Sequence, residues 1–494
     1  MKIHSSAIRP DRRRWIALIV ICLGQLMIVL DSTIVNVALP SIQRDLHFSQ
    51  ANLTWVVNGY LIAYGSFLLI GGRAGDLIGR RKVFLAGVLV FTMASVLSGL
   101  AQDSATLIGA RFLQGLGGAL SAGVILALIV TGFPQPSERA QAMSVFTFVL
   151  AGGGSLGLLA GGMLTQMISW HWIFFINVPI GVGTLLLGWR LIEENEGIGL
   201  SHGVDVAGSI LVSAAVMLGV YAIVTAADQG WGSDHTIGFG AAAILLLIAF
   251  FWLEARLENP ILPPRILRLR SLTGASAARA MLATGMFTTF FLGALYLQNV
   301  KGYGAVGTGL AFLPTTLALA VLSLGITARL MRTFGPRALL IPGLVLITSA
   351  LVLLSTADQH AAYFPGIFGA YLLFGIGAGM SFMPLMTIMM ADVPAADAGV
   401  ASGVANVTMQ VGAAFGLAAL GTIATDHSRT LIAQGNSIVS ALTGGYQLGF
   451  AIAAACVATG LLIVVVVLRS AGGMRSQRPI ARPEPESEEA SEAA

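Results

Sequence analysis

Fourteen long apolar runs dominate this sequence and leave few folds open to it. A helix needs about 20 mostly apolar residues to cross a bilayer. Runs of that kind lie near residues 15–39, 53–71, 84–101, 105–131, 143–165, 172–190, 206–226, 236–253, 274–299, 306–327, 338–355, 362–390, 400–423 and 446–468. They are continuous rather than alternating in polarity, so they predict helices and not barrel strands. We therefore expect an all-α polytopic membrane protein with 14 transmembrane helices.

The composition excludes several other classes of protein. The chain is 56% hydrophobic and 10% charged, whereas soluble domains carry about 25% charged residues. Its two cysteines, Cys22 and Cys456, lie inside apolar runs and indicate neither a disulfide framework nor a zinc site. No nucleotide-binding loop and no nucleophile–base or metal-ligand spacing occurs. We expect no enzymatic activity, catalytic residue, cofactor, metal site or nucleic-acid partner.

Lysine and arginine are distributed unequally between the two sides of the predicted helices. If both termini and every second loop share one side, that side holds 22 basic residues. The other side holds three, namely Arg44, Lys301 and Arg429, while Arg111 and Arg279 lie within predicted spans. Basic residues concentrate in cytoplasmic loops. The sequence therefore predicts a multi-pass protein of the cell (cytoplasmic or inner) membrane, with an even number of spans and both termini in the cytoplasm.

An internal repeat divides the chain into two halves. The segment Asp76-Leu-Ile-Gly79-Arg80-Arg81-Lys82 is echoed by Arg332-Thr-Phe-Gly335-Pro336-Arg337, at an offset of 256 residues that also aligns the flanking spans. We expect a basic cytoplasmic terminus (1–14), a six-helix bundle (15–190), two inserted helices with flanking cytoplasmic loops (191–272), a second six-helix bundle (273–469) and a disordered cytoplasmic tail (470–494). Parallel repeats are typical of transporters that rock two halves around a central site.

Two charged residues lie within predicted spans of the first half. Asp31 lies on an arc of about 140° that also holds the polar residues Gln25, Ser32 and Asn36. From the same membrane face, Asp31 is roughly 13 Å deep and Arg111 roughly 9 Å deep, so the two can pair. Charged residues inside spans are rare and mostly functional. The alternatives are a purely structural pair and an arginine that reaches the headgroups.

Three further sets of residues are candidates for function. A basic loop after the second span contains Gly72, Asp76, Gly79 and Arg80, and a strip of small residues in the fifth span contains Gly153, Gly157, Gly161 and Gly162. Polar and aromatic side chains that can line a substrate cavity are Gln25, Asn36, Trp55, Asn58, Gln114, Gln298 and Asn406. Each set has an alternative interpretation. The basic loop can be a turn that follows the positive-inside rule. The aromatic side chains can lie at the membrane interface, and the polar ones can form hydrogen bonds between helices.

Taken together, these motifs resemble those of the major facilitator superfamily, and within it the fourteen-span drug:proton antiporters (QacA-like and EmrB-like efflux pumps). The resemblance runs from Asp31 to about Gly421. It implies the major facilitator fold, proton handling at Asp31 and Arg111, a cytoplasmic latch at Asp76, and a glycine strip where the halves meet. Several positions depart from the family pattern: Leu158 replaces a proline, His171 replaces an arginine, and the basic loop differs at Ala74, Gly75 and Leu77.

The function expected from the sequence is proton-coupled export of amphipathic organic compounds, such as drugs or antibiotics, by alternating access. The partners would be a small organic substrate, protons and the lipid bilayer. We expect the chain to work as a monomer, although its oligomeric state stays open. An uptake symporter or uniporter on the same fold is one alternative, and a membrane scaffold or sensor without transport is another.

Overall fold

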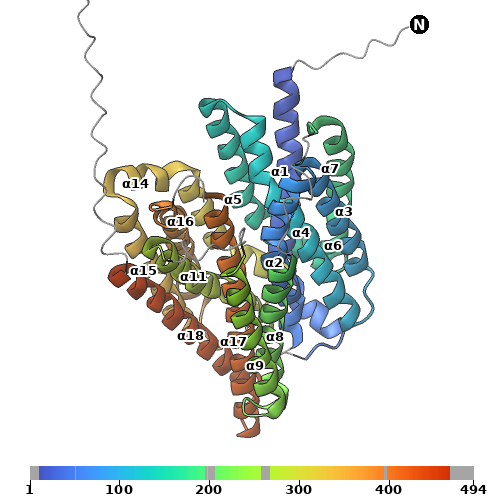
Figure 1. Cartoon of the computed structure of the whole chain (residues 1–494). Helices are drawn as coiled ribbons and strands as arrows, with labels where there is room; N and C mark the ends of the chain where they lie inside the picture. The colour runs from blue at the N-terminus through green and yellow to red at the C-terminus, as the bar shows by residue number, and fades with distance from the viewer. Residues whose placement is uncertain are drawn as a thin grey trace, which may run out of the picture.

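The structure is a computed structural model that describes residues 10–49, 52–194, 197, 206–257, 268–393 and 398–467. Most of the predicted amino-terminal segment 1–14 and the whole predicted tail 470–494 lie outside these residues. The described chain is helical throughout (Figure 1).

The amino-terminal half comprises α1 (Pro10–Asp45), η1 (Asn52–Thr54), α2 (Trp55–Ile78), α3 (Arg80–Gly99), α4 (Ser104–Gly132), α5 (Pro136–Met167), α6 (Trp172–Phe175) and α7 (Asn177–Leu191). Local sequence explains several of these limits. Asp103 caps α4 by accepting a 2.8 Å hydrogen bond from the Thr106 amide, and Pro136 occupies the first turn of α5, where no amide proton is needed.

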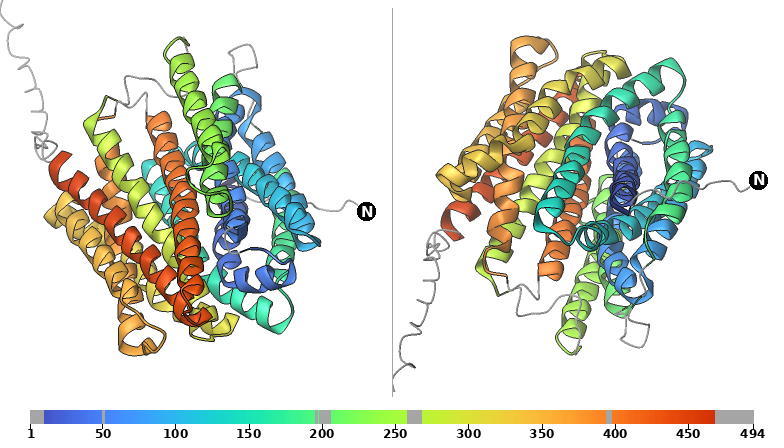
Figure 2. Two further views of the ribbon diagram at one scale, coloured as in Figure 1. Left: turned by 90° about the horizontal axis from the view of Figure 1, so that it is seen from below. Right: turned by 90° about the horizontal axis from the view of Figure 1, so that it is seen from above.

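Two inserted helices follow, α8 (Val206–Gln229) and α9 (Asp234–Glu254). They form a hairpin whose turn is closed by Ser233, the side chain of which accepts a 3.2 Å hydrogen bond from the Thr236 amide. Helix α8 packs against both α2 and α17, so the hairpin covers the seam between the two halves on one side (Figures 1 and 2).

The carboxyl-terminal half comprises α11 (Arg270–Leu295), η3 (Tyr296–Val300), α12 (Ala305–Ala311), α13 (Leu313–Val321), η4 (Leu322–Ile326), α14 (Thr327–Phe334), α15 (Pro336–Ser355), η5 (Tyr363–Ile367), α16 (Phe368–Met390), α17 (Ala398–Ala433) and α18 (Ile438–Val466). The sequence predicts one span over 306–327, but the helix is broken there, because Gly325 has a φ of 124° that no α-helix accommodates.

The two halves repeat the same backbone features. Gly79 separates α2 from α3 with a φ of 107°, and Gly335, at the offset of 256 residues, separates α14 from α15 with a φ of 83°. A Cβ atom on Gly115 in α4 would lie 2.3 Å from a carbonyl oxygen of α2, and one on Gly375 in α16 would lie 2.3 Å from a carbonyl oxygen of α13. Equivalent helices therefore approach each other at glycine in both halves.

Ten helices in the described part of the chain are long and apolar enough, by length and composition, to cross a membrane. Three shorter apolar helices cover Leu156–Met167, Ile210–Ala226 and Ala305–Val321. Many side chains on the outside of the bundle are large and apolar, for example Trp189, Leu186 and Leu245, each at least 65% exposed. This is an all-helical membrane protein, and the count of fourteen crossings stays a prediction.

The ends of the helices define two faces of the molecule. On the amino-terminal face, where α1, α3 and α5 begin, Arg13 donates a 3.0 Å hydrogen bond to the carbonyl of Arg190, and Arg14 lies 3.6 Å from Glu138. On the opposite face, the indole of Trp170 donates a 2.7 Å hydrogen bond to Asp45. Basic side chains predicted to be cytoplasmic therefore share the amino-terminal face.

The described halves approach each other closely at the opposite face. Gln298 in η3 donates a 2.8 Å hydrogen bond to the carbonyl of Val37 in α1, and the amide of Val306 in α12 donates a 3.0 Å hydrogen bond to Gln166 in α5. In Figure 1 the ribbons of the two halves converge toward the lower end, away from the amino terminus. The structure is therefore a conformation in which the opposite face is closed.

Candidate functional site

A buried ion pair lies at the centre of the amino-terminal half. Asp31 in α1 and Arg111 in α4 are both 0% exposed, and Nη1 of Arg111 donates a 2.5 Å hydrogen bond to Oδ2 of Asp31. The sequence places the two charges at comparable depth, and the structure brings them into direct contact. A buried carboxylate needs such a partner, since an isolated charge in an apolar interior is strongly unfavourable.

Amide side chains complete the surroundings of the carboxylate. Oδ1 of Asp31 accepts hydrogen bonds from Gln114 at 3.0 Å and from Asn177 at 3.1 Å. Gln114 also donates to the Ser95 hydroxyl at 2.8 Å and accepts from Arg111 at 2.9 Å. Four helices, α1, α3, α4 and α7, thus contribute one side chain or more to a single polar network.

The guanidinium of Arg111 has further neighbours. Its Nε donates a 2.9 Å hydrogen bond to the carbonyl of Val56 in α2. Its central carbon lies 4.5 Å from the ring centre of Tyr60 and 5.8 Å from that of Phe174, where aromatic faces attract a cation. Only Nη2 is buried without a hydrogen-bond partner. The arginine is therefore fixed by a carboxylate, an amide, a carbonyl and two rings.

This arrangement links the charge of Asp31 to the positions of four helices. The ionised carboxylate accepts all three hydrogen bonds. A protonated carboxyl would pair less well with Arg111, since its negative charge would be gone and one oxygen would carry a proton. Gain or loss of one proton would therefore change the preferred packing of α1 against α4 and α7. Both side chains of the pair are fully buried in this conformation.

The predicted cavity residues of the amino-terminal half do not gather around one opening. Gln25 and Asn36 are 6% and 4% exposed, and Asn36 donates to the carbonyl of Ser32 in its own helix at 3.2 Å. Gln114 belongs to the buried network rather than to an open surface. Asn58 is 0% exposed, and both polar atoms of its side-chain amide are without a hydrogen-bond partner.

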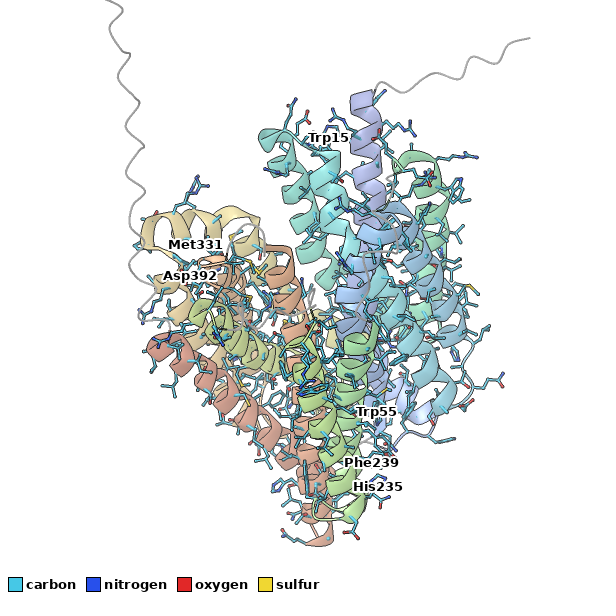
Figure 3. The ribbon with its side chains drawn as sticks, in the orientation of Figure 1. Trp15, Trp55, His235, Phe239, Met331 and Asp392 are labelled. Atoms are coloured by element: carbon cyan, nitrogen blue, oxygen red, sulfur yellow. The ribbon has the colours of Figure 1, made fainter. Side chains whose placement is uncertain are left out.

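Trp55 lies in an aromatic cluster with the inserted hairpin. Its ring centre is 6.2 Å from that of Tyr221 in α8, which is 5.0 Å from the ring of Phe239 in α9. Figure 3 shows Trp55, Phe239 and His235 toward the closed end of the molecule. Contact with the hairpin accounts for this tryptophan.

The two predicted cavity residues of the second half lie in different places. Gln298 joins the halves at the closed face through its bond to the carbonyl of Val37. Asn406 is partly exposed near the amino-terminal end of α17 and already interacts with another group. The sequence proposal of one cavity lined by all seven residues is therefore not visible as a single surface in this conformation.

The basic loop is a tight connection between α2 and α3. Gly79 accounts for the turn, because its φ of 107° is unfavourable for any residue with a side chain. Gly72 faces α4, where a Cβ atom would lie 3.3 Å from the carbonyl oxygen of Gly123. Arg80 begins α3 and is partly buried. The side chain of Asp76 lies outside the described part of the structure, so its predicted latch stays a prediction.

The glycine strip of α5 packs against two different helices. Cβ atoms on Gly157 and Gly161 would lie 2.0 Å from Oγ1 of Thr33 and 2.6 Å from the carbonyl oxygen of Ile34, both in α1. Gly153 also faces α1, at 3.0 Å from Val29. A Cβ on Gly162 would instead lie 2.7 Å from the carbonyl oxygen of Ala305 in α12 of the other half.

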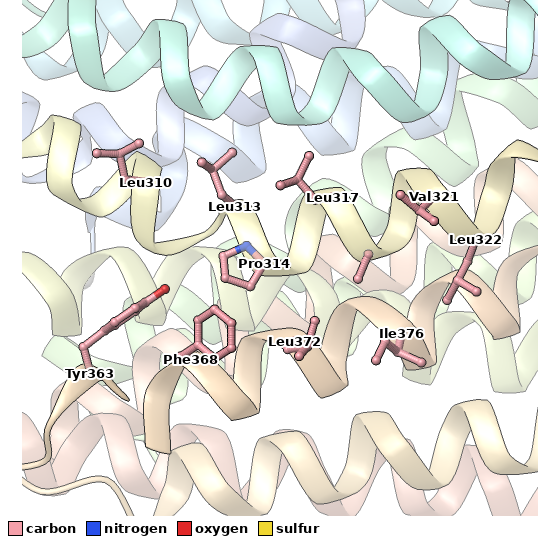
Figure 4. Close-up of a pocket in the computed structure, with 11 residues that line it drawn as sticks. Leu310, Leu313, Pro314, Leu317, Val321, Leu322, Tyr363, Phe368, Leu372 and Ile376 are labelled. Atoms are coloured by element: carbon pink, nitrogen blue, oxygen red, sulfur yellow. The ribbon is translucent and has the colours of Figure 1, made fainter. Parts of the chain in front are cut away.

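One pocket of about 760 Å³ lies elsewhere, in the carboxyl-terminal half between α12, α13, η4 and α16 (Figure 4). Its lining consists of apolar side chains and Tyr363, whose hydroxyl donates a 2.9 Å hydrogen bond to the carbonyl of Ala311. None of the residues predicted from sequence lines it. In the described part of the chain, no cluster of His, Cys, Asp and Glu is arranged to hold a metal ion.

His171 stands where the related family motif has arginine. Its ring stacks on Trp170 at 3.8 Å between centres, beside the Trp170–Asp45 hydrogen bond. Burial lowers the pKa of His171, and the Asp45 carboxylate acts in the opposite direction. This corner of the closed face therefore carries less positive charge near neutral pH than an arginine would give it.

Three side chains that take part in these contacts are not candidates from the sequence: Ser95, Asn177 and Arg279. The contact of Asn177 with Asp31 joins residues 146 positions apart, so no local sequence pattern predicts it. Arg279 was noted only as a charge within a span. Its guanidinium contacts the sulfur atoms of Met386 at 3.7 Å and Met409 at 3.5 Å.

The fold and this network define a class of protein: a membrane protein of two repeated helical halves, with a charged pair buried in the first. Comparison with known proteins then identifies the family. The family model described as "Major Facilitator Superfamily" matches residues 21–417. The chain belongs to the major facilitator superfamily.

Relatives of this chain carry names that refer to antibiotics. The chain is 38% identical to the puromycin resistance protein pur8 of Streptomyces alboniger, with 93% of this chain and 91% of the relative covered. It is 36% identical to the cephamycin export protein CmcT of Amycolatopsis lactamdurans, with 82% and 84% covered. The tetracenomycin C resistance and export protein of Streptomyces glaucescens is 33% identical, with 85% and 78% covered.

Solved structures agree with the fold. A bacterial homologue of the human lysosomal transporter Spinster, crystallised in an inward-facing and unoccupied conformation, gives a TM-score of 0.66 at 15% identity, covering 93% of this chain and 97% of that one. The POT family transporter PepTSo gives a TM-score of 0.67 at 14% identity, covering 93% and 99%. The chain is therefore a multi-pass membrane transporter of the major facilitator superfamily, and the three relatives are named for resistance to antibiotics or for their export.

Proposed function

We propose that this protein exports amphipathic organic compounds, including antibiotics, in exchange for protons that enter the cell. The observation that carries the proposal is the fully buried Asp31–Arg111 pair, held by Gln114 and Asn177 inside one of two repeated halves. An ionised carboxylate inside a membrane span is energetically costly, and such residues are mostly functional. The names of the relatives support antibiotics as the class of substrate.

The mechanism that follows is alternating access with one titrating carboxylate. Proton binding at Asp31 weakens its pairing with Arg111 and so changes the packing of α1, α4 and α7. Release of the proton restores the pair. Moving one charge through a membrane potential supplies about 2.3 kcal/mol per 100 mV, so inward movement of protons can drive the substrate outward.

The proposal includes an orientation. Fourteen spans with both termini in the cytoplasm place the amino-terminal face, with Arg13, Arg14 and Arg81, on the cytoplasmic side. The closed opposite face would then be the external side. In this conformation substrate would enter from the cytoplasm, and the next step of an exporter would be opening of the external face.

Transport by the purified protein in liposomes tests the proposal. Vesicles with an imposed pH gradient and no membrane potential should accumulate puromycin on the acidic side, and addition of puromycin to vesicles without a gradient should move protons in the opposite direction. An uncoupler should abolish accumulation. Puromycin movement that ignores the pH gradient would refute antiport, and movement with the protons would identify an uptake symporter instead.

A further inference from the structure

Arg279 is a second arginine inside a predicted span, and its surroundings differ sharply from those of Arg111. It lies in α11, about 13 Å along the helix axis from the first residue of that helix. The stretch Arg270–Val300 is itself long and apolar enough to cross a membrane. Arginine at this depth is costly unless it is paired or faces a water-filled space.

Among the residues that the structure describes, the guanidinium of Arg279 has only weak partners. Nη1 lies 3.7 Å from the sulfur of Met386 in α16, and Nη2 lies 3.5 Å from the sulfur of Met409 in α17. Nε is buried without a hydrogen-bond partner. A thioether is a weak acceptor, so no strong acceptor within the described part of the chain satisfies this cation. Arg111, by contrast, is bound by a carboxylate, an amide and a carbonyl.

Helix α17 shows which way this site faces. Its residue Gln410 packs against Gly65 of α2 in the other half, Gly412 and Gly416 pack against α11, and Phe415 packs against α8 on the outside. With 100° per residue, Met409 and Asn406 lie on the arc between the α2 and α11 contacts, away from the α8 contact. Arg279 therefore lies beside the seam between the halves, where carriers of this fold place their central site.

We infer that Arg279 is the anchor of a subsite for organic anions, formed by α11, α16 and α17. A carboxylate can accept two parallel hydrogen bonds from a guanidinium. Here the bonds from Nε and Nη2 would satisfy the buried Nε and replace the contact of Nη2 with Met409. The polarizable side chains of Met386 and Met409 would lie against the apolar body attached to the anionic group. The inference rests on the proposed function and names a substrate class for it: amphipathic compounds with one anionic group.

Two probes with the same apolar body isolate the effect of charge. The full-length protein in nanodiscs would be titrated with 1-pyrenebutanoate and with its uncharged amide, and binding to empty nanodiscs would be subtracted. The wild type should bind the anion about tenfold more tightly than the amide, because a charge-assisted hydrogen bond contributes more than a neutral one.

Substitutions at Arg279 then assign that preference. Arg279→Gln should weaken binding of the anion about tenfold and leave binding of the amide unchanged, and Arg279→Lys should keep part of the preference. Arg256→Gln removes an exposed arginine whose guanidinium lies 3.9 Å from the centre of the Trp252 ring, so it is the matched control and should change neither affinity.

Each remaining outcome is decisive. Equal weakening of both probes by Arg279→Gln would show that Arg279 positions the helices rather than binding an anion, and would overturn the inference. The inference would also be overturned if the wild-type protein bound neither probe, or bound the anion and the amide with equal affinity. Binding does not require a proton gradient, so the two proposals can fail separately. If the wild-type protein prefers the anion but shows no proton-coupled transport in liposomes, the proposed function is refuted and the subsite remains supported.

Discussion

At the scale of single residues, two arginines in helices of opposite halves show what burial demands. Arg111 has a carboxylate, an amide, a carbonyl and two aromatic rings around it, whereas Arg279 has two thioethers. The first is a closed set of interactions in which one proton can alter the balance. The second is an open set that a ligand can complete. Under the two proposals, the same type of side chain would serve different chemistry because its neighbours differ.

Replacing Asp31 with asparagine tests the role of the interactions around Arg111. Asp31→Asn keeps the size of the side chain but removes its charge, so Arg111 loses its anionic partner. We expect the variant to insert in the membrane and to lose proton-coupled export of most substrates. Substrate-induced proton release from the purified variant is the measurement. Arg111→Lys, which keeps a cation near Asp31, should retain some function, and normal proton release from Asp31→Asn would exclude Asp31 from the proton path.

Helical geometry predicts the pair but not its other partners. Depth along two helices can be calculated from a rise of about 1.5 Å per residue, and this places Asp31 near Arg111. The contact of Asn177 with Asp31 depends on how α7 packs against α1. That packing cannot be deduced from the identity of residue 177. The sequence predicts Gln114 at a substrate cavity. In the structure its amide is buried and donates a hydrogen bond to Ser95 of α3, a contact that again depends on how two helices pack.

At the scale of helices, the glycine strip of α5 offers a sharp test of close packing. Gly157→Ala would put a Cβ about 2.0 Å from Oγ1 of Thr33, a distance that forces α5 away from α1. We expect a loss of roughly 1–3 kcal/mol of stability and strongly reduced export, measured as thermal unfolding and dye extrusion. Gly154→Ala is the control, because its nearest neighbour would be 4.0 Å away.

A second substitution identifies the cause. If the hydroxyl of Thr33 is the obstacle, Thr33→Ala should restore much of the function of Gly157→Ala while having little effect alone. Normal export by the single variant Gly157→Ala would show that α5 and α1 do not approach this closely.

Helix α2 carries an unusual buried amide at its contact with α17. Asn58 is completely buried without a hydrogen-bond partner, and it lies one turn after Thr54, which contacts Gly421 of α17. Asn58→Leu removes this unsatisfied group. We expect a higher unfolding temperature and slower transport, since the conformation closed at the opposite face would become more stable. Faster transport at unchanged stability would contradict this account.

Hydropathy predicts the existence of helices better than their continuity. The run 306–327 is apolar throughout, yet the structure breaks it into α12, α13 and η4, and Gly325 leaves the helical region altogether. The length of an apolar run reports burial in lipid, while backbone breaks depend on neighbouring helices and on single glycines. Helix α1 also extends beyond its predicted span 15–39, because its polar first and last turns are helical but not apolar.

For the whole molecule, the sidedness in the membrane rests on the distribution of basic residues. In a variant with Cys22 and Cys456 replaced by alanine, Asn436→Cys and His360→Cys lie on exposed turns of the closed face, and Thr333→Cys is exposed on the amino-terminal face. The first two should react with an impermeant maleimide in intact cells. The third should react only after permeabilisation, and the reverse pattern would refute the orientation.

Alternating access requires that the closed face separate during each cycle, and the contact between α5 and α12 allows this to be tested. Gln166 and Val306 meet there across the two halves. A short bis-thiosulfonate linking Gln166→Cys to Val306→Cys should stop export, and a reducing agent should restore it. Ala357→Cys with Gln447→Cys is the matched control: both lie at the same face but within one half, where Gln447 donates a 3.1 Å hydrogen bond to the carbonyl of Ala357. Linking that pair should leave transport intact, because the proposed alternating access moves each half as a unit. Continued export with the first pair linked would mean that the halves do not part at this face, and that substrate leaves by another route.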